Sequence, residues 1–404
     1  MSVVDDILDY IRSGEADDKN LGLEIEHFVI NDQGEQITFD EVTKLIESVA
    51  KRIGAKIHHM DGYPVGYYTG EYSVSLEPAC QFEISIDPFD DLDKIKNIYD
   101  GFIALWEPVF KERGYHFETK GNLPLVELGK IKPDDIPLSA KKRYKYMNEY
   151  FEKSGKYGKY MMRASASTQI SVDYSSEKDM VRKLSVLQKI SPVLMMMMEN
   201  KTDEDSNILG KKHLMRIQEW EDLDPERTGF FPGSFDKDFG YKKAAEVIFN
   251  TPLILLTDRG ETISVGSKSA SDLYSEGVLN AGEADEERKR ALIEHFISMG
   301  FFHFRIKKYI EIRIADSVPI QKALGYVALI KGIVYSSENL DLLSDELKDT
   351  DSAEKIRDAV EKTEKDGFDA VIYKGKTVRS WADHLKEIAG AHLDRTDGEY
   401  LKYV

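Results

Sequence analysis

Apolar and polar residues alternate along several short segments of the chain, and this period of two is typical of β-strands. We predict strands over residues 21–31, 55–60, 66–69, 72–77, 81–87 and 166–174. One further strand is expected over residues 305–316, where isoleucines alternate with charged residues. Short turns separate several of these segments, which favours antiparallel pairing.

Apolar positions spaced near 3.6 residues predict helices elsewhere. These helices are expected over residues 3–12, 39–53, 90–113, 139–151, 177–199, 241–248 and 284–299, and almost throughout from about residue 318. No repeat or linker-like segment interrupts the pattern, so we expect a single domain over residues 1–404. The predicted fold class is α+β: a largely antiparallel, curved sheet lines a cleft, and helices pack on its outer side.

Carboxylates and amides lie on one face of several predicted strands, because residues two apart on a strand point the same way. Glu24 and Glu26 share a face of the first strand, opposite to its apolar residues. Glu83 has the same position in a later strand, with Glu77 shortly before it, and Gln169 in another. A Glu-x-Glu pair is also common on exposed strands, so the first pair alone does not define a site.

The strand over residues 305–316 carries Arg305, Lys307, Glu311 and Arg313 on the face opposite to its isoleucines. Taken alone, this segment fits an ordinary amphipathic edge strand about as well as a strand inside the molecule. The mostly apolar residues 299–304 that precede it favour a central strand whose polar face lines a cleft. A carboxylate among Arg and Lys side chains in a cleft suits an anionic ligand together with a metal ion.

The predicted polar faces together contribute five carboxylates, namely Glu24, Glu26, Glu77, Glu83 and Glu311. Neighbouring carboxylates repel one another, which raises their pKa values, and a divalent cation bound between them removes this repulsion. Oxygen ligands suit Mg²⁺ or Mn²⁺, whereas zinc fits poorly because Cys80 is the single cysteine. Neither glycine-rich phosphate loop motif is present, so a nucleotide would be held through metals and basic side chains.

Composition and charge exclude several classes of function. The formal net charge of −18 argues against nucleic acid and against an anionic membrane surface as partners. No apolar run approaches the roughly 20 residues of a membrane-spanning helix, and no signal peptide is visible. The single cysteine excludes an intramolecular disulfide and fits a reducing cytoplasm, so we expect a cytoplasmic protein.

Five ordered blocks of the sequence resemble the plant-type glutamate–cysteine ligases, a family of carboxylate–amine ligases shared by plants and many bacteria. The first block, residues 22–28, is similar to the family's Gly-x-Glu-x-Glu-x-Phe strand, and residues 76–84 are similar to Leu-Glu-Pro-Gly-Gly-Gln-Phe-Glu-Leu. Residues 162–180 form a third block, and residues 216–229 match Arg-x₃-Trp-x₃-Asp-x-x-Arg-Thr-Gly. The last block, residues 305–316, resembles Arg-Leu-Lys-Arg-Tyr-Leu-Glu-Met-Arg-Gly-Ala-Asp.

The resemblance implies an ATP-dependent γ-glutamyl transfer with a glutamine synthetase-like catalytic fold. ATP would phosphorylate the side-chain carboxylate of glutamate, and the amine of cysteine would then displace the phosphate. The products are γ-glutamylcysteine, ADP and phosphate, the first step of glutathione biosynthesis. The implied partners are the small molecules glutamate, cysteine and ATP, with the chain as a monomer or homodimer. A ligase for another acceptor amine and a non-catalytic binding protein remain alternatives, although the full set of carboxylates speaks against the second.

The resemblance also implies roles for the charged residues of the predicted strands. The five carboxylates would hold two or three Mg²⁺ ions around the phosphates, with Mn²⁺ as a possible substitute. Arg305, Lys307 and Arg313 would act in catalysis by offsetting charge on the transferring phosphoryl group, and with Glu83 they would bind ATP.

Four more residues are expected to contact the substrates. Arg163 and Arg216 would bind substrate carboxylates, because a planar guanidinium can donate two parallel hydrogen bonds to a carboxylate. Thr168 and Gln169 would hydrogen-bond the substrate or a metal-bound water.

The chain departs from the family pattern where the Gly-Gly pair is replaced by Ala79-Cys80. Glycine pairs mark a backbone that needs a positive φ or a close approach, so the replacement bears on which acceptor amine fits. Cys80 is expected to be a small buried residue rather than a nucleophile. Trp220 is expected to be a packing anchor, and for His27 a place in the core or beside a partner strand is at least as good an interpretation as a catalytic role. For Arg227 a loop-organising role and a ligand role both remain open.

Overall fold

The computed structural model describes residues 2–280 and 284–404. An open antiparallel sheet lies at the centre, built from β1 (Leu21–Asn31), β2 (Lys56–Met60), β3 (Tyr63–Tyr68), β4 (Tyr72–Leu76), β5 (Phe82–Phe89), β6 (Tyr115–Glu118), β7 (Ser167–Val172), β12 (Phe304–Ile306) and β13 (Ile310–Asp316). The strand order is β12-β13-β7-β1-β5-β4-β3-β2, and β6 extends the far end of β1. Two small sheets pair β8 (Thr228–Gly229) with β11 (Phe301–Phe302), and β9 (Leu255–Asp258) with β10 (Glu261–Ser264). The expected antiparallel α+β architecture is thus confirmed.

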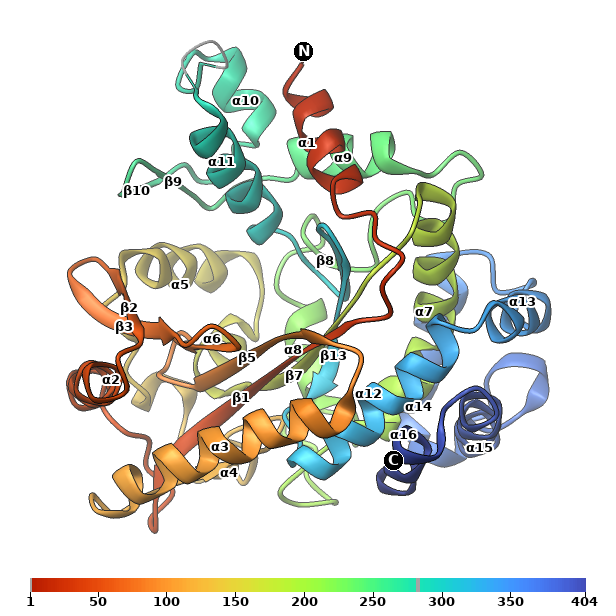
Figure 1. Cartoon of the computed structure of the whole chain (residues 1–404), viewed down its shortest axis with the longest axis horizontal. Helices are drawn as coiled ribbons and strands as arrows, with labels where there is room; N and C mark the ends of the chain where they lie inside the picture. The colour runs from red at the N-terminus through yellow and green to blue at the C-terminus, as the bar shows by residue number, and fades with distance from the viewer. Residues whose placement is uncertain (1, 281–283) are drawn as a thin grey trace.

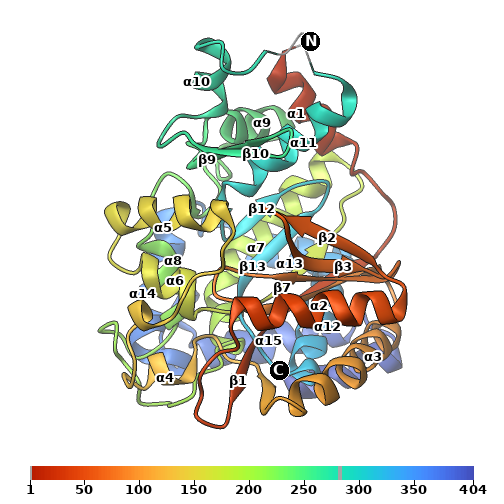
Figure 2. The same cartoon turned by 90° about the vertical axis from the view of Figure 1, so that its left-hand side faces the viewer.

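Helices surround this sheet (Figures 1 and 2). They are α1 (Val3–Arg12), α2 (Phe39–Ile53), α3 (Leu92–Lys111), α4 (Pro124–Glu127), α5 (Lys142–Ser154), α6 (Gly158–Ala164), α7 (Glu177–Met197), α8 (Met215–Glu221), α9 (Tyr241–Asn250), α10 (Ala270–Ser275), α11 (Glu286–Ser298), α12 (Ile320–Val334), α13 (Ser337–Glu346), α14 (Ala353–Asp366), α15 (Val378–Gly390) and α16 (Arg395–Tyr400). None of the helices in the described part of the chain is both long enough and apolar enough to cross a bilayer.

The apolar face of the sheet forms the core together with α3, α7 and α12, and Figure 1 shows α3 and α12 crossing in front of the strands. Ile25, Ile84 and Ile170 are fully buried there. His27 belongs to the same face: its ring nitrogens hydrogen-bond the Phe82 carbonyl and the Tyr99 hydroxyl. Burial lowers the pKa of His27 to about 4, so its ring is neutral, as expected for an interior histidine.

Residues 305–316 form a β-hairpin, and the prediction of one continuous strand is wrong at this point. β12 and β13 pair antiparallel with Arg305 opposite Glu311, and the turn contains Lys308. The backbone N–H of Lys307 donates to the Tyr309 carbonyl and closes the turn. Alternation concealed the turn, because its residues include neither glycine nor proline. The hairpin nevertheless keeps Arg305 and Glu311 on one face, because they are cross-strand partners.

Strand register places the polar side chains in rows across the other face of the sheet. Glu83 of β5 lies opposite Glu26 of β1, and Glu24 of β1 lies opposite Gln169 of β7. Glu311 of β13 lies opposite Ser171 of β7 on one side and Arg305 of β12 on the other. Segments far apart in sequence thus contribute to one continuous polar surface.

Candidate active site

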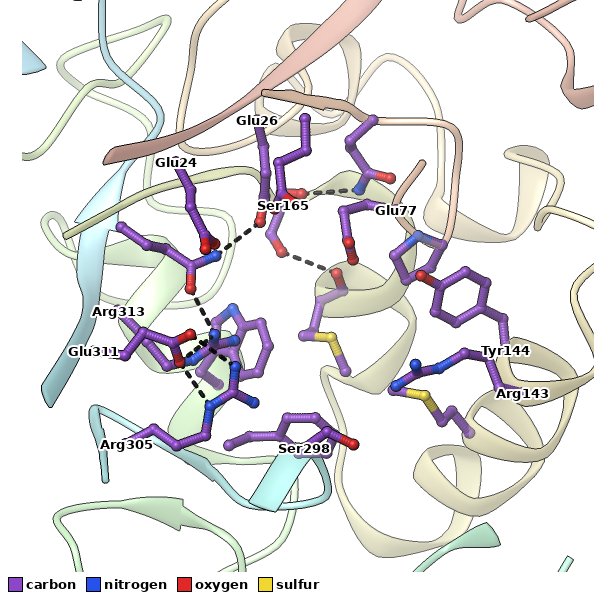
Figure 3. Close-up of a pocket in the computed structure, with 18 of the residues that line it drawn as sticks. Glu24, Glu26, Glu77, Arg143, Tyr144, Ser165, Ser298, Arg305, Glu311 and Arg313 are labelled. Atoms are coloured by element: carbon purple, nitrogen blue, oxygen red, sulfur yellow. Dashed lines mark hydrogen bonds and ion pairs between the residues drawn. The ribbon is translucent and has the colours of Figure 1, made fainter. Parts of the chain in front are cut away.

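A cavity of about 260 Å³ opens over this polar face (Figure 3). Nine of the residues singled out from the sequence line it, namely Glu24, Glu26, Glu77, Glu83, Gln169, Arg305, Lys307, Glu311 and Arg313. Helix α5 adds Arg143 and Tyr144 to the lining, and α8 adds the large aromatic side chain of Trp220. The cavity therefore combines acidic, basic and aromatic groups in a small volume.

Glu311 is the centre of a compact group that we call the cation cluster, formed by Arg305, Lys307 and Arg313 around this one carboxylate. Arg305 donates from Nε and Nη2 to the two Glu311 oxygens at 2.6 and 3.0 Å. Lys307 Nζ and Arg313 Nη1 each lie 3.1 Å from a Glu311 oxygen. Only 1% of the Glu311 side chain is exposed, so these ion pairs are shielded from water.

The second group, the carboxylate wall, consists of Glu24, Glu26, Glu77 and Glu83. None of the four has an ion-pair partner among the described residues. Two of them are held by neutral donors. Glu26 accepts from the Ser167 N–H and hydroxyl at 2.8 and 2.9 Å and from Gln169 Nε2 at 3.2 Å.

Glu83 accepts from two serine hydroxyls, Ser75 at 2.9 Å and Ser85 at 3.0 Å. A hydroxyl orients a carboxylate but does not neutralise it. The negative charge of the wall is therefore positioned by hydrogen bonds and left largely unbalanced.

The two groups shift carboxyl pKa values in opposite directions. Burial and the charge of Glu77 raise the pKa of Glu26 to about 7. Burial and the charges of Glu24, Glu77 and Glu26 raise the pKa of Glu83 well above its ordinary value. Burial alone would also raise the pKa of Glu311, but the charges of the three surrounding cations hold it well below the usual range.

The chemistry of the carboxylate wall fits a hard divalent cation, because its donors are oxygen atoms whose buried charges repel one another. In residues 2–280 and 284–404, no three acidic, cysteine or histidine side chains are already placed around a common metal position. Glu311 differs from the other four predicted ligands, since its oxygens are occupied by cationic donors. The structure thus separates one of the five carboxylates from the set that the sequence groups together.

Three residues expected at the substrate do not line the cavity. Arg163 of α6 donates to the Pro133 carbonyl at 3.3 Å and to the Asn148 side chain at 3.1 Å. Arg216 is 3% exposed and donates to the Arg313 carbonyl at 3.1 Å. It therefore holds the backbone of one residue of the cation cluster. Thr168 is fully buried, and its hydroxyl accepts the backbone N–H of Val318 at 3.2 Å.

Strand alternation explains both the failure at Thr168 and a residue that the sequence interpretation missed. Gln169 points into the cavity, where its Oε1 accepts from Arg313 at 2.5 Å. Its neighbour Thr168 must therefore point the opposite way, and Ser167, two residues before Gln169, shares the cavity side. The alternation of side chains along β7 could therefore have identified Ser167 as a residue on the cavity side of the sheet.

Cys80 occupies a strained position of the backbone. Its φ is +66°, in the left-handed region that residues with a Cβ rarely adopt. The side chain is buried, and burial raises the pKa of the thiol to about 12, so it is not a ready nucleophile. Cys80 faces a separate cavity of about 500 Å³ behind the segment that carries Glu77.

Arg227 lies in the loop after α8, and Trp220 lies within α8 itself. Arg227 is fully buried and donates to the Asp224 carboxylate at 2.8 Å and to two backbone carbonyls. These contacts favour the loop-organising role over a ligand role. Trp220 packs beside the guanidinium groups of Arg216 and Arg313, 5.5 and 5.8 Å from its ring.

Comparisons with known proteins identify relatives of most of the chain. The family model described as glutamate–cysteine ligase family 2 matches residues 20–200 and 213–398. A rice (Oryza sativa subsp. japonica) protein named glutamate–cysteine ligase B, chloroplastic, is 27% identical over 354 residues, covering 87% of this chain and 70% of the relative. The chloroplastic glutamate–cysteine ligase of Medicago truncatula is 28% identical over 396 residues, with 96% and 75% covered.

A solved structure, that of glutamate–cysteine ligase from Francisella tularensis in complex with AMP, has a similar fold. Its TM-score is 0.51 at 12% sequence identity, and the match covers 96% of this chain and 81% of that chain. The rice and Medicago names also correct one prediction: the cytoplasmic location expected from the sequence is contradicted by relatives that are chloroplastic. A single cysteine does not distinguish one reducing compartment from another.

Proposed function

We propose that this chain, which belongs to glutamate–cysteine ligase family 2, uses ATP to join the γ-carboxylate of glutamate to the amine of cysteine. The observation that carries the proposal is the cation cluster and the carboxylate wall facing one cavity. The product, γ-glutamylcysteine, belongs to the first step of glutathione biosynthesis. The relatives named as glutamate–cysteine ligases support cysteine as the acceptor.

The cation cluster would bind the phosphate groups of ATP. Arg305, Lys307 and Arg313 carry three positive charges, of which Glu311 balances one, so a net positive charge remains for an anion. Because these side chains are already fixed by Glu311, they need little rearrangement when negative charge develops on the transferring phosphoryl group. Glu311 is thus proposed to position the cations and not to ligate a metal.

The carboxylate wall would hold Mg²⁺, or Mn²⁺ in its place, when the nucleotide binds. Such ions would supply positive charge next to the phosphates and reduce the electrostatic repulsion between ATP and the carboxylates. Glu24, Glu26, Glu77 and Glu83 are the proposed ligands, and their side chains would turn toward the shared ion. Ser167 and Gln169 keep Glu26 oriented for this role.

Release of ADP from ATP tests the proposal with the purified chain, Mg²⁺, glutamate and cysteine. We expect release only when all components are present, together with γ-glutamylcysteine detected by mass spectrometry. Alanine and 2-aminobutyrate serve as acceptor controls, because both keep the amino-acid backbone and lack the thiol. Release that requires glutamate but is indifferent to cysteine would exclude a glutamate–cysteine ligase.

A further inference from the structure

A second cavity, of about 500 Å³, lies behind the turn formed by residues 77–81. Ala79 and Cys80 line this second cavity, whereas Glu77, Pro78 and Gln81 of the same turn line the active-site cavity (Figure 3). No described residue lines both cavities. The turn therefore separates them, and it carries one proposed metal ligand on its active-site side.

Hydrogen bonds hold this turn together as one unit. The Cys80 N–H donates to the Glu77 carbonyl at 3.0 Å, and the Glu77 N–H donates to the Gln81 carbonyl at 2.9 Å. The Ala79 N–H donates to the side-chain oxygen of Gln81 at 2.8 Å. A molecule that packs against Ala79 and Cys80 is thus connected to Glu77 through a short, hydrogen-bonded segment of backbone.

The interior of the second cavity is mainly apolar. Ala79, Leu123 and Ile136 of its lining are at most 5% exposed, and the half-buried Ile131 packs against the same small apolar cluster. A cavity of this size and character is typical of sites for small organic molecules, because the ligand removes apolar surface from water. The second cavity therefore suits a ligand with an apolar body.

The charged residues of the second cavity, Glu35 and Asp135, are both acidic and lie at its exposed side. Neither has an ion-pair partner within residues 2–280 and 284–404. Each accepts one hydrogen bond from a neutral donor: Glu35 from the Asn31 amide at 3.0 Å, and Asp135 from the Lys132 backbone N–H at 2.9 Å. Charge complementarity therefore favours a cationic head group on the ligand and disfavours an anionic one.

We propose that the second cavity binds a small apolar cation with an ammonium head group, and that this ligand stabilises the turn that carries Glu77. The apolar body would pack against Ala79 and Cys80, and the ammonium would face Glu35 and Asp135. The turn stands in the arrangement in which Glu77 lines the active-site cavity, so the ligand and Mg²⁺ favour the same state of the turn. The site itself is independent of the proposed function, whereas its link to Mg²⁺ rests on that function.

The first experiment compares three probes that share a naphthalene body and differ in the charge of the head group: naphthylethylamine, naphthylethanol and naphthylacetate. Isothermal titration calorimetry at pH 8 gives the Kd of each probe for the parent chain. We expect the amine to bind about 10-fold more tightly than the carboxylate, with the alcohol between them. In the double variant Glu35→Gln, Asp135→Asn the three Kd values should approach one another, because the exposed side of the cavity no longer carries charge.

The single cysteine, Cys80, reports whether the amine occupies this cavity. At ten times its Kd, naphthylethylamine should slow the labelling of Cys80 by methyl methanethiolsulfonate about 10-fold, because occupied chains are protected. Intact-protein mass spectrometry measures the rate. Ile131→Trp should fill the cavity and abolish both binding and protection. Leu128→Trp is the matched control, because Leu128 is outside the lining and exposed, and it should abolish neither.

The link to Glu77 is tested by titrating Mg²⁺ calorimetrically with and without saturating naphthylethylamine. We expect Mg²⁺ to bind about 5-fold more tightly when the amine is present. The amine should gain the same factor in the presence of Mg²⁺, because coupling between two sites is reciprocal. In Ile131→Trp the amine should leave the affinity for Mg²⁺ unchanged.

Equal affinities for the amine and the carboxylate would overturn the site, as would labelling of Cys80 that the amine does not slow. Both measurements use the parent chain, so they decide the question even if Ile131→Trp folds poorly. Amine binding with an unchanged affinity for Mg²⁺ would overturn the link to Glu77. Failure of the proposed function gives a different result: the parent chain then forms no γ-glutamylcysteine, while amine binding and the protection of Cys80 are retained.

Discussion

The two charged groups of the cavity are built in opposite ways. In the cation cluster, one carboxylate is surrounded by three positive side chains from a single hairpin. In the carboxylate wall, four carboxylates from β1, β5 and the end of β4 lack ion pairs among the described residues, and only Glu26 and Glu83 are held by hydroxyl or amide donors. The carboxylate of the first group is fully paired before any ligand arrives, whereas the carboxylates of the second group are not.

This difference indicates which part of the site is rigid and which depends on ligands. Ion pairs fix the cation cluster in its working geometry. The carboxylate wall must take up protons or cations to relieve its repulsion, and its raised pKa values reflect that need. Removing a carboxylate should therefore have opposite consequences in the two groups.

The largest expected effect is on stability. Glu311→Gln should lower the free energy of unfolding by about 3–5 kcal/mol, because it leaves three cations uncompensated in a buried site. Glu83→Gln should be neutral or stabilising at pH 8, because it removes a repelled charge while an amide can still accept from Ser75. Urea unfolding followed by fluorescence measures both.

The matched control is Glu361→Gln, which changes an exposed carboxylate of α14 and should shift stability by less than about 0.5 kcal/mol. Equal destabilisation by the Glu311 and Glu83 variants would contradict the contrast between the two groups.

The second prediction concerns pH. The pKa of Glu26 is about 7 in the folded chain and near 4.5 when unfolded, so between these values the folded state holds the extra proton. The stability of the parent chain relative to Glu26→Gln should therefore fall as pH rises from about 4.5 to 7, and then level off. Glu311 has the opposite sign: its contribution is complete above about 4.5 and is lost as pH falls further.

Mg²⁺ should reverse the loss at high pH. Thermal unfolding is expected to show a larger Mg²⁺-induced rise in Tm at pH 8 than at pH 5.5, with the difference reduced in Glu26→Gln. If Mg²⁺ raises Tm equally at both pH values and in both proteins, the carboxylate wall is not the metal site.

The third prediction separates two neighbours on β7. Ser167→Ala should lower kcat/KM about 5- to 10-fold, the value of one hydrogen bond, because Glu26 loses the hydroxyl that orients it. Thr168→Val should leave kcat/KM nearly unchanged and lower stability by about 1 kcal/mol, because the Val318 N–H loses its acceptor. Steady-state kinetics and urea unfolding of the same two preparations decide the matter; the reverse pattern would place Thr168 at the substrate.

The smallest expected effect is at Cys80, beside the segment that carries Glu77. Cys80→Gly should be more stable than Cys80→Ala by about 1 kcal/mol, because both lose the thiol and only glycine relieves the positive φ. The difference in stability between the two variants measures the contribution of backbone strain alone. Equal stabilities would show that the position carries no strain.

The period of two in the sequence was enough to predict the polar face, because alternation alone places Glu24, Glu26 and Glu83 on one side. It did not reveal how charges pair across strands. Glu311 looked like a fifth metal ligand until the hairpin put Arg305 directly opposite it. Arg143 gave no signal at all, because it lies on a helix whose entry into the cavity depends on contacts with Leu76.

The register of the central strands has a consequence for how this chain can change over time. Inserting one residue in β1 before Glu24 would turn both of its glutamates toward the core and its isoleucines toward the cavity. Except at a bulge such as the register shift between Leu21 and Leu23, one-residue length changes are therefore costly within β1, β5 and β7, whereas loops can change in length. The family match is unbroken through those strands and is interrupted at residues 201–212, a segment in which Lys201 Nζ holds three backbone carbonyls together. Such a loop can gain or lose residues without shifting any side chain across the sheet.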